Sequence, residues 1–225
     1  MSAAEVRRQQ NRAIGEEDSL SVLQVIDKLT VGPVITKTNQ LIAPYAVTNN
    51  GSTHEKELSY RYEEEVFDPE DPASSNLASM IAVQVALNYG LFCKEIVFRG
   101  HFDATDRRFV QEMLANTARE IYVKKIQQPN AFLTPEFAGL PLERRDNYVN
   151  ARVLFEPAVA GTFTGWQGDS DLYSVLSSGG KDSLLTFGLL RELECDVHPI
   201  YINESGRHWF TAVNAFREFR RTVPN

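Results

Sequence analysis

Cysteine is scarce in this sequence. Two occur among the 225 residues, Cys93 and Cys195, and they lie far apart. This number excludes the disulfide-dense scaffold of a small secreted domain and argues against a paired-cysteine site. Cys93 also lies in an apolar segment with no histidine beside it in the sequence. The segment before Asp18 is polar and lacks the apolar core of a signal peptide, so we expect a cytoplasmic protein.

Long apolar runs and an excess of basic residues are also missing. Hydrophobic residues make up 43% of the chain, an ordinary value for a globular protein. No apolar run approaches the roughly 18 residues of a membrane span. The net charge of −7 argues against a broad nucleic-acid footprint. The four histidines have no metal-ligand spacing. We therefore expect one or two domains with no membrane partner, no nucleic-acid partner and no metal site built from protein side chains.

What the sequence does contain is a glycine turn, residues 177–183, with the sequence SSGGKDS. It follows a predicted strand, residues 172–176, and precedes a helical pattern. A strand that feeds a turn and then a helix directs several backbone N–H groups and a positive helix end at one small volume. Gly179 and Gly180 carry no Cβ, so a ligand can approach their backbone closely. The turn therefore predicts a phosphate-binding loop.

The side chains of the turn suit the same ligand. Lys181 is a compact charge with three donors, and Ser178 and Ser183 bring hydroxyl groups. Asp182 is the odd member, because a carboxylate repels phosphate unless it contacts a metal, a ribose or a backbone donor, or caps the helix. It favours Mg²⁺-linked nucleotide chemistry. An ordinary N-capped helix after a glycine turn remains the alternative.

Two common phosphate loops are excluded. A Walker loop needs glycine where this chain has Val175, and serine or threonine where it has Asp182. The dinucleotide fingerprint G-x-G-x-x-G is absent. Residues 178–183 instead match S-G-G-x-D-S, which resembles the PP-loop of the ATP pyrophosphatase superfamily.

This resemblance implies a chemistry. Members of the superfamily split ATP between its α- and β-phosphates: a substrate carboxylate or carbonyl oxygen attacks the α-phosphorus and pyrophosphate leaves. The implied cofactors are ATP and Mg²⁺, and the implied partner is a small molecule with a carboxylate. Ser178 would brace the turn, and Asp182 would organise the loop or reach the Mg²⁺ shell. The leaving pyrophosphate would be held by Gly179, Gly180, Lys181 and Ser183. Lys181 and Asp182 are the catalytic candidates.

Within the superfamily, the chain looks most similar to the UDP-N-acetylmuramoyl-L-alanyl-L-glutamate epimerase family. The similarity covers residues 178–184, the helix end 189–192, and the upstream segments 86–91 and 95–97. It implies adenylation of a terminal glutamate carboxylate in peptidoglycan precursor synthesis, followed by inversion at Cα. No proton-transferring residue is matched.

A second predicted strand, residues 196–202, ends at Asn203 and Glu204. In an open parallel sheet, ligands lie beyond the carboxyl ends of the strands. These two residues would then lie beside the loop, within reach of ribose or adenine. A simple turn followed by a helix start explains them equally well.

These patterns predict an α/β protein in three parts. Residues 1–18 form a flexible tail, and residues 19–168 form an N-terminal α+β accessory or substrate domain. Residues 169–225 form the first β-loop-α-β-α part of a doubly wound parallel-sheet nucleotide domain. Because such a domain needs more strands, we expect the front part of a longer protein. A homo-oligomer and a non-catalytic nucleotide-binding or interaction module both remain open.

Turn-forming residues divide the N-terminal domain into short apolar segments. Between residues 20 and 67, apolar residues broken by Gly32-Pro33 and Asn49-Asn50-Gly51 predict antiparallel hairpins. The remaining expectations are a helix over 77–91 capped by Ser74 or Ser75, a strand over 95–98, a helix from Asp103 to about Lys124, and a loop-rich stretch over 127–171.

Overall fold

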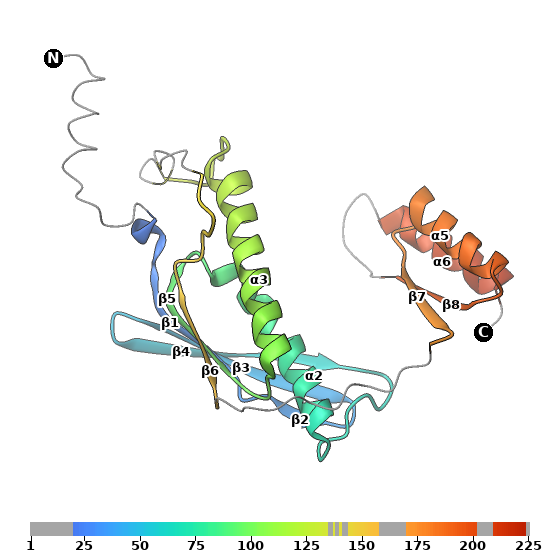
Figure 1. The fold of residues 1–225 in the computed structure, drawn as a ribbon, viewed down its shortest axis with the longest axis horizontal. Coiled ribbons are helices and arrows are strands. Elements are labelled where there is room, and N and C mark those ends of the chain that lie inside the picture. The colour runs from blue at the N-terminus through green and yellow to red at the C-terminus, as the bar shows by residue number, and fades with distance from the viewer. Residues whose placement is uncertain are drawn as a thin grey trace. The chain divides into compact units, whose positions relative to one another are not determined.

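The computed structural model describes residues 20–134, 137, 140, 144–157, 170–201 and 209–223. The chain divides into two compact units, Met1–Gly165 and Trp166–Asn225. Each unit combines strands with helices, and Figure 1 shows both. The protein is therefore of the mixed α/β class, as predicted.

The first unit is built on a six-stranded mixed sheet. Strands β1, β5 and β6 run parallel to one another, whereas β3 pairs antiparallel with β1, β2 and β4. The strands are β1 (Ile26–Val31), β2 (Ile35–Lys37), β3 (Gln40–Asn49), β4 (Ser52–Arg61), β5 (Cys93–Arg99) and β6 (Arg152–Glu156). The predicted antiparallel hairpins are confirmed for β2 to β4. The strand β6 lies inside the stretch that the sequence analysis assigned to loops, and that assignment was wrong there.

Strand β2 continues β1 along the same edge of β3 through a bulge. The chain advances four residues from Val31 to Ile35 while the partner strand moves three, from Tyr45 to Ile42. One extra residue is therefore accommodated between β1 and β2. Gly32 begins this bulge with a φ of +88°, and a Cβ there would lie 2.1 Å from the carbonyl oxygen of Arg99. Only glycine lets the end of β1 lie this close to the end of β5.

Helices α2 (Pro72–Val83) and α3 (Ala104–Ile121) both lie in the first unit. Short helical turns flank them: η1 (Ser21–Leu23), η2 (Val85–Tyr89) and η3 (Tyr122–Ile126). The Asp71 carboxylate caps α2 by accepting hydrogen bonds from the amides of Ala73 and Ser74. The predicted cap at Ser74 or Ser75 was wrong, because Asp71 and Pro72 start the helix earlier. The predicted start of α3 is confirmed by a capping box between Asp103 and Asp106.

The helices cover one face of this sheet (Figure 1). Their small and branched residues meet alternate residues of the strands in one continuous core, which is the main source of hydrophobic stabilisation. Its fully buried members include Leu29, Leu41, Ala78, Ala82, Ile96, Phe98, Val110 and Leu114. A second cluster joins the far end of α3 to η1 through Leu20, Leu23, Ala118, Tyr122 and Tyr148.

The second unit contains two strands and two helices in the predicted order. They are β7 (Leu172–Leu176), α5 (Lys181–Glu192), β8 (Asp196–Ile200) and α6 (Trp209–Thr222). Strands β7 and β8 pair in parallel, so α5 is the crossover of a β-α-β unit. Its core is small, with Val175, Phe187 and Val197 buried. Many apolar side chains stay exposed, among them Leu176, Leu185, Leu189, Leu193 and Phe210. Among the helices that the structure describes, none is long and apolar enough to cross a membrane.

Candidate functional site

The predicted loop lies at the junction of β7 and α5, as the sequence pattern required. Gly179 has a φ of +75°, in the left-handed region. A Cβ on Gly179 would lie 2.6 Å from the carbonyl oxygen of Thr211, in the first turn of α6. The bend therefore packs closely on a second helix, and it needs glycine both for its conformation and for this contact.

Helix α5 begins without a side-chain cap. Gly180 is the N-cap residue, in an extended conformation, and it offers no side chain to accept the first amides. The first helical hydrogen bond runs from the Leu184 amide to the Gly180 carbonyl, at 3.1 Å. The amides of residues 181–183 precede that bond, so they are the orphan donors of this helix end. An anion is the ligand that such a helix end favours.

Hydroxyl groups hold the loop in shape. The Ser183 hydroxyl donates to the Gly180 carbonyl at 3.0 Å and lies 3.2 Å from the Ser177 hydroxyl. The Gly179 amide donates to the Ser177 oxygen at 3.2 Å. Ser177 is 7% exposed, and sequence reasoning gave it no role. The only signal was its place between the strand and the first residue of the motif.

The two charged residues of the motif are accessible to a ligand. Lys181 and Asp182 are exposed at the start of α5, and neither forms an ion pair within the described residues. The Ser178 side chain is exposed as well. The ammonium group of Lys181 is thus available to a ligand at the mouth of the loop, and the nearby carboxylate of Asp182 limits how much negative charge gathers there.

The end of β8 closes one side of the loop. The Ser177 amide donates to the Ile200 carbonyl at 2.8 Å, so the two strands remain paired up to the loop. Tyr201 follows, packed against the rings of Phe216 and Phe219. Burial raises the pKa of Tyr201, whose buried hydroxyl makes no hydrogen bond within the described part of the chain. Asn203 and Glu204, the predicted ribose or adenine contacts, lie outside the described residues.

Other chemistries find less support. No group of three or more acidic, histidine or cysteine side chains that could hold a metal gathers in the described ranges. The thiol of Cys93 is fully buried, and burial raises its pKa to about 12, so it remains a thiol at neutral pH.

Comparison of the chain with protein-family models, with curated proteins and with solved structures gave no match.

Proposed function

We propose that this protein is an ATP-binding enzyme of the PP-loop type, which adenylates a substrate carboxylate in the cytoplasm and releases pyrophosphate. One observation carries the proposal. The SGGKDS segment joins a parallel strand to a helix whose first amides are uncapped, with Gly179 at a positive φ and Lys181 unpaired beside it. This combination is better suited to binding a polyphosphate ligand than to being capped by one side chain.

The reaction needs charge stabilisation more than covalent work by the protein. A carboxylate oxygen of the substrate would form a bond to the α-phosphorus of ATP. The bond from that phosphorus to the bridging oxygen would break, and pyrophosphate would leave with the electron pair. Lys181 and the amides of residues 181–183 would bind the charge that develops on the leaving group. Ser177 and Ser183 would keep the loop in its bound shape before ATP arrives.

Mg²⁺ fits this site as an ion that arrives with the nucleotide. The ion is commonly held by one or two carboxylates together with substrate phosphates and water. Asp182 is the acid in the first turn of α5, and it is exposed and unpaired. We therefore assign Asp182 either to the coordination shell of this ion or to the organisation of the loop. We propose no metal site that is built from protein side chains alone.

The β7-α5-β8 unit with α6 would be the beginning of a doubly wound sheet, preceded by an α+β accessory domain. Exposed apolar side chains on α5 and β7, such as Leu185, Leu189 and Leu176, support the idea that further elements pack on this unit.

The substrate class is a small carboxylic acid. The local similarity to UDP-N-acetylmuramoyl-L-alanyl-L-glutamate epimerases makes the terminal glutamate of that precursor the first compound to test. Turnover of this compound should release pyrophosphate and invert its glutamate Cα, which chiral analysis after hydrolysis would detect.

A second candidate function is a non-catalytic nucleotide-binding or interaction module. It is favoured by the small size of the second unit, whose described sheet has two strands. Such a module would bind ATP at the loop without cleaving it.

The test is ATP–pyrophosphate exchange with the full chain, Mg²⁺ and a panel of carboxylic acids. Exchange should depend on the acid, and Lys181→Ala should reduce it by at least about 100-fold. Arg217→Ala, which removes an exposed cation from α6, is the matched control and should retain activity. ATP binding without exchange would select the module. Formation of ADP and phosphate would contradict the adenylation mechanism.

A further inference from the structure

The first unit has a crevice of its own, at the carboxyl ends of its three parallel strands. After β1 the chain turns toward β2 and β3, whereas after β5 it passes through α3 to β6 on the other side. The strand order therefore reverses between β1 and β5. In open sheets with parallel strands, ligands bind at such a point, outside the carboxyl ends of the strands.

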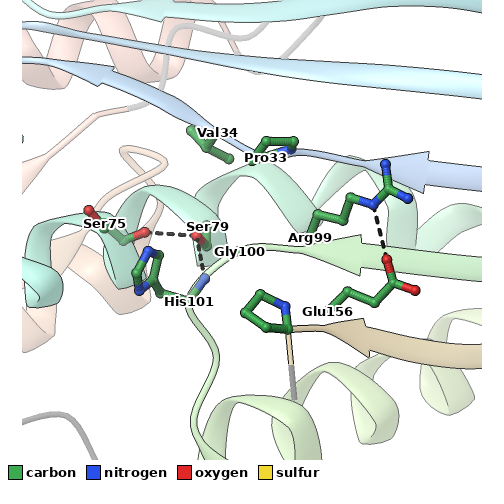
Figure 2. A pocket seen from close by; sticks show the side chains of 9 residues that line it. Pro33, Val34, Ser75, Ser79, Arg99, Gly100, His101 and Glu156 are labelled. Carbon is green, nitrogen blue, oxygen red and sulfur yellow. Dashed lines mark hydrogen bonds and ion pairs between the residues drawn. The ribbon is translucent and has the colours of Figure 1, made fainter. Parts of the chain in front are cut away.

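A cavity of about 460 Å³ occupies this position. Its walls come from the residues that follow β1, β5 and β6, together with one side of α2. The volume lies in the usual range for small-molecule sites, roughly 300–1,000 Å³. Figure 2 shows the Arg99–Glu156 ion pair on one side of the lining and Ser75 and His101 on the other.

The backbone of the cavity wall is fixed by satisfied hydrogen bonds. The Ser79 hydroxyl donates to the Ser75 carbonyl at 2.8 Å and accepts from the His101 amide at 3.2 Å. The Gly100 amide donates to the Glu156 carbonyl at 2.9 Å. A Cβ on Gly100 would lie 2.6 Å from the Ser79 hydroxyl oxygen, so glycine is needed for this packing. The wall is therefore preorganised before any ligand binds.

Two polar groups of the wall keep donors to spare. The Arg99 Nε donates to Glu156 at 3.1 Å, which leaves the outer N–H groups of the guanidinium for another acceptor. The Ser75 hydroxyl makes no side-chain hydrogen bond within the described part of the chain. Beside these donors lie the apolar surfaces of Pro33, Val34 and Pro157. The lining thus offers an oxyanion donor, the guanidinium of Arg99, together with a surface for a carbon skeleton.

We propose that this cavity binds a small molecule that carries one carboxylate on an apolar body. The planar guanidinium of Arg99 matches a carboxylate in shape, and its outer N–H groups can donate to both carboxylate oxygens. A phosphate dianion suits the site less well, because the Glu156 carboxylate lies in the same wall and repels additional negative charge. The site stands whether or not the second unit binds ATP.

The probes are benzoate, its neutral analogue benzamide, and inorganic phosphate. Each is titrated into the ¹⁵N-labelled full chain at constant ionic strength, and amide chemical shifts are followed. Benzoate should shift the signals of Arg99, Gly100 and Glu156 in a saturable way. Benzamide and phosphate should bind at least about 10-fold more weakly, because benzamide carries no charge and phosphate is not planar.

Arg99→Gln is the decisive variant, and it should weaken benzoate binding at least about 10-fold. The Arg99–Glu156 pair is about half exposed, at 48% and 49%, so its loss costs little stability. Arg61→Gln, which removes an exposed arginine from β4, is the matched control and should bind benzoate like the parent protein. The proposal is overturned if benzoate gives no saturable shifts at these residues, if phosphate or benzamide binds as well, or if Arg99→Gln and Arg61→Gln behave alike.

Discussion

The hydroxyl oxygens of Ser177 and Ser183 lie 3.2 Å apart beneath the glycine bend that joins β7 to α5. Ser183 donates its one hydroxyl hydrogen to the Gly180 carbonyl, so Ser177 is the donor between the two serines. The Ser177 oxygen in turn accepts from the Gly179 amide. This chain of hydrogen bonds couples the buried end of the strand to the start of the helix. The bend is thereby held in shape, while the amides of residues 181–183 precede the first hydrogen bond of α5.

Ser177→Ala should loosen this loop. It removes the acceptor of the Gly179 amide and the donor to Ser183, and we expect the free energy of unfolding of the second unit to fall by about 1 kcal/mol. Both tryptophans of the chain, Trp166 and Trp209, belong to this unit, so urea titrations followed by tryptophan fluorescence report on it. Ser174→Ala, at an exposed position of β7, is the control and should change stability by less than about 0.5 kcal/mol. Equal effects of the two variants would contradict the bracing role.

Substitution by alanine should change the stability of the same unit in opposite directions at two of its glycines. Gly179→Ala places a Cβ 2.6 Å from the Thr211 carbonyl oxygen at a φ of +75°, and we expect a loss of about 2 kcal/mol or more. Gly188 lies inside α5 with open space around it. Gly188→Ala should therefore stabilise the unit by about 0.5–1 kcal/mol. The same fluorescence titration measures both. Stabilisation by Gly179→Ala would show that the bend is not held in this conformation.

The two cysteines should differ in reactivity. The Cys93 thiol is fully buried and its pKa is raised to about 12, so about one molecule in ten thousand carries the thiolate at pH 8. Cys195 is partly exposed. Iodoacetamide should alkylate Cys195 in the native protein at least about 100-fold faster than Cys93, and peptide mass spectrometry would measure this. In urea the rates should become similar. Fast native labelling of Cys93 would contradict its burial.

Local patterns in the sequence were sufficient for several elements. Asn50-Gly51 predicted a tight turn, and both residues adopt a positive φ between β3 and β4. Asp103, three residues before Asp106, forms the capping box that starts α3. The strand, glycine bend and helix around residues 172–192 follow from residue types that are adjacent in the chain.

Long-range pairing was harder to predict. Strand β6, Arg152–Glu156, pairs with β5 across more than fifty residues of sequence, and its flanking prolines and glycines read as a loop. No local pattern in the sequence indicated the parallel pairing of β1 with β5 either. Ser177 shows the same limit at the site. Its role depends on a hydroxyl six residues away, which comes near only when the bend and the helix form together.

Two glycines of the first unit have similar φ values but different surroundings. Gly32 has a φ of +88° and Gly51 a φ of +74°. Alanine at Gly51 would meet open space and should cost about 1–2 kcal/mol for the conformation alone. Alanine at Gly32 would also overlap the Arg99 carbonyl oxygen, 2.1 Å from its Cβ, so β1 and β5 must separate there.

Gly32→Ala should therefore cost at least about 3 kcal/mol, more than Gly51→Ala. Hydrogen exchange of peptides that cover β5, compared between the two variants and the parent chain, would measure the difference within the first unit. Faster exchange in Gly32→Ala should concentrate at the carboxyl ends of β1 and β5, where the cavity lies. If both variants exchange alike, the two strand ends are not in the close contact on which the cavity wall depends.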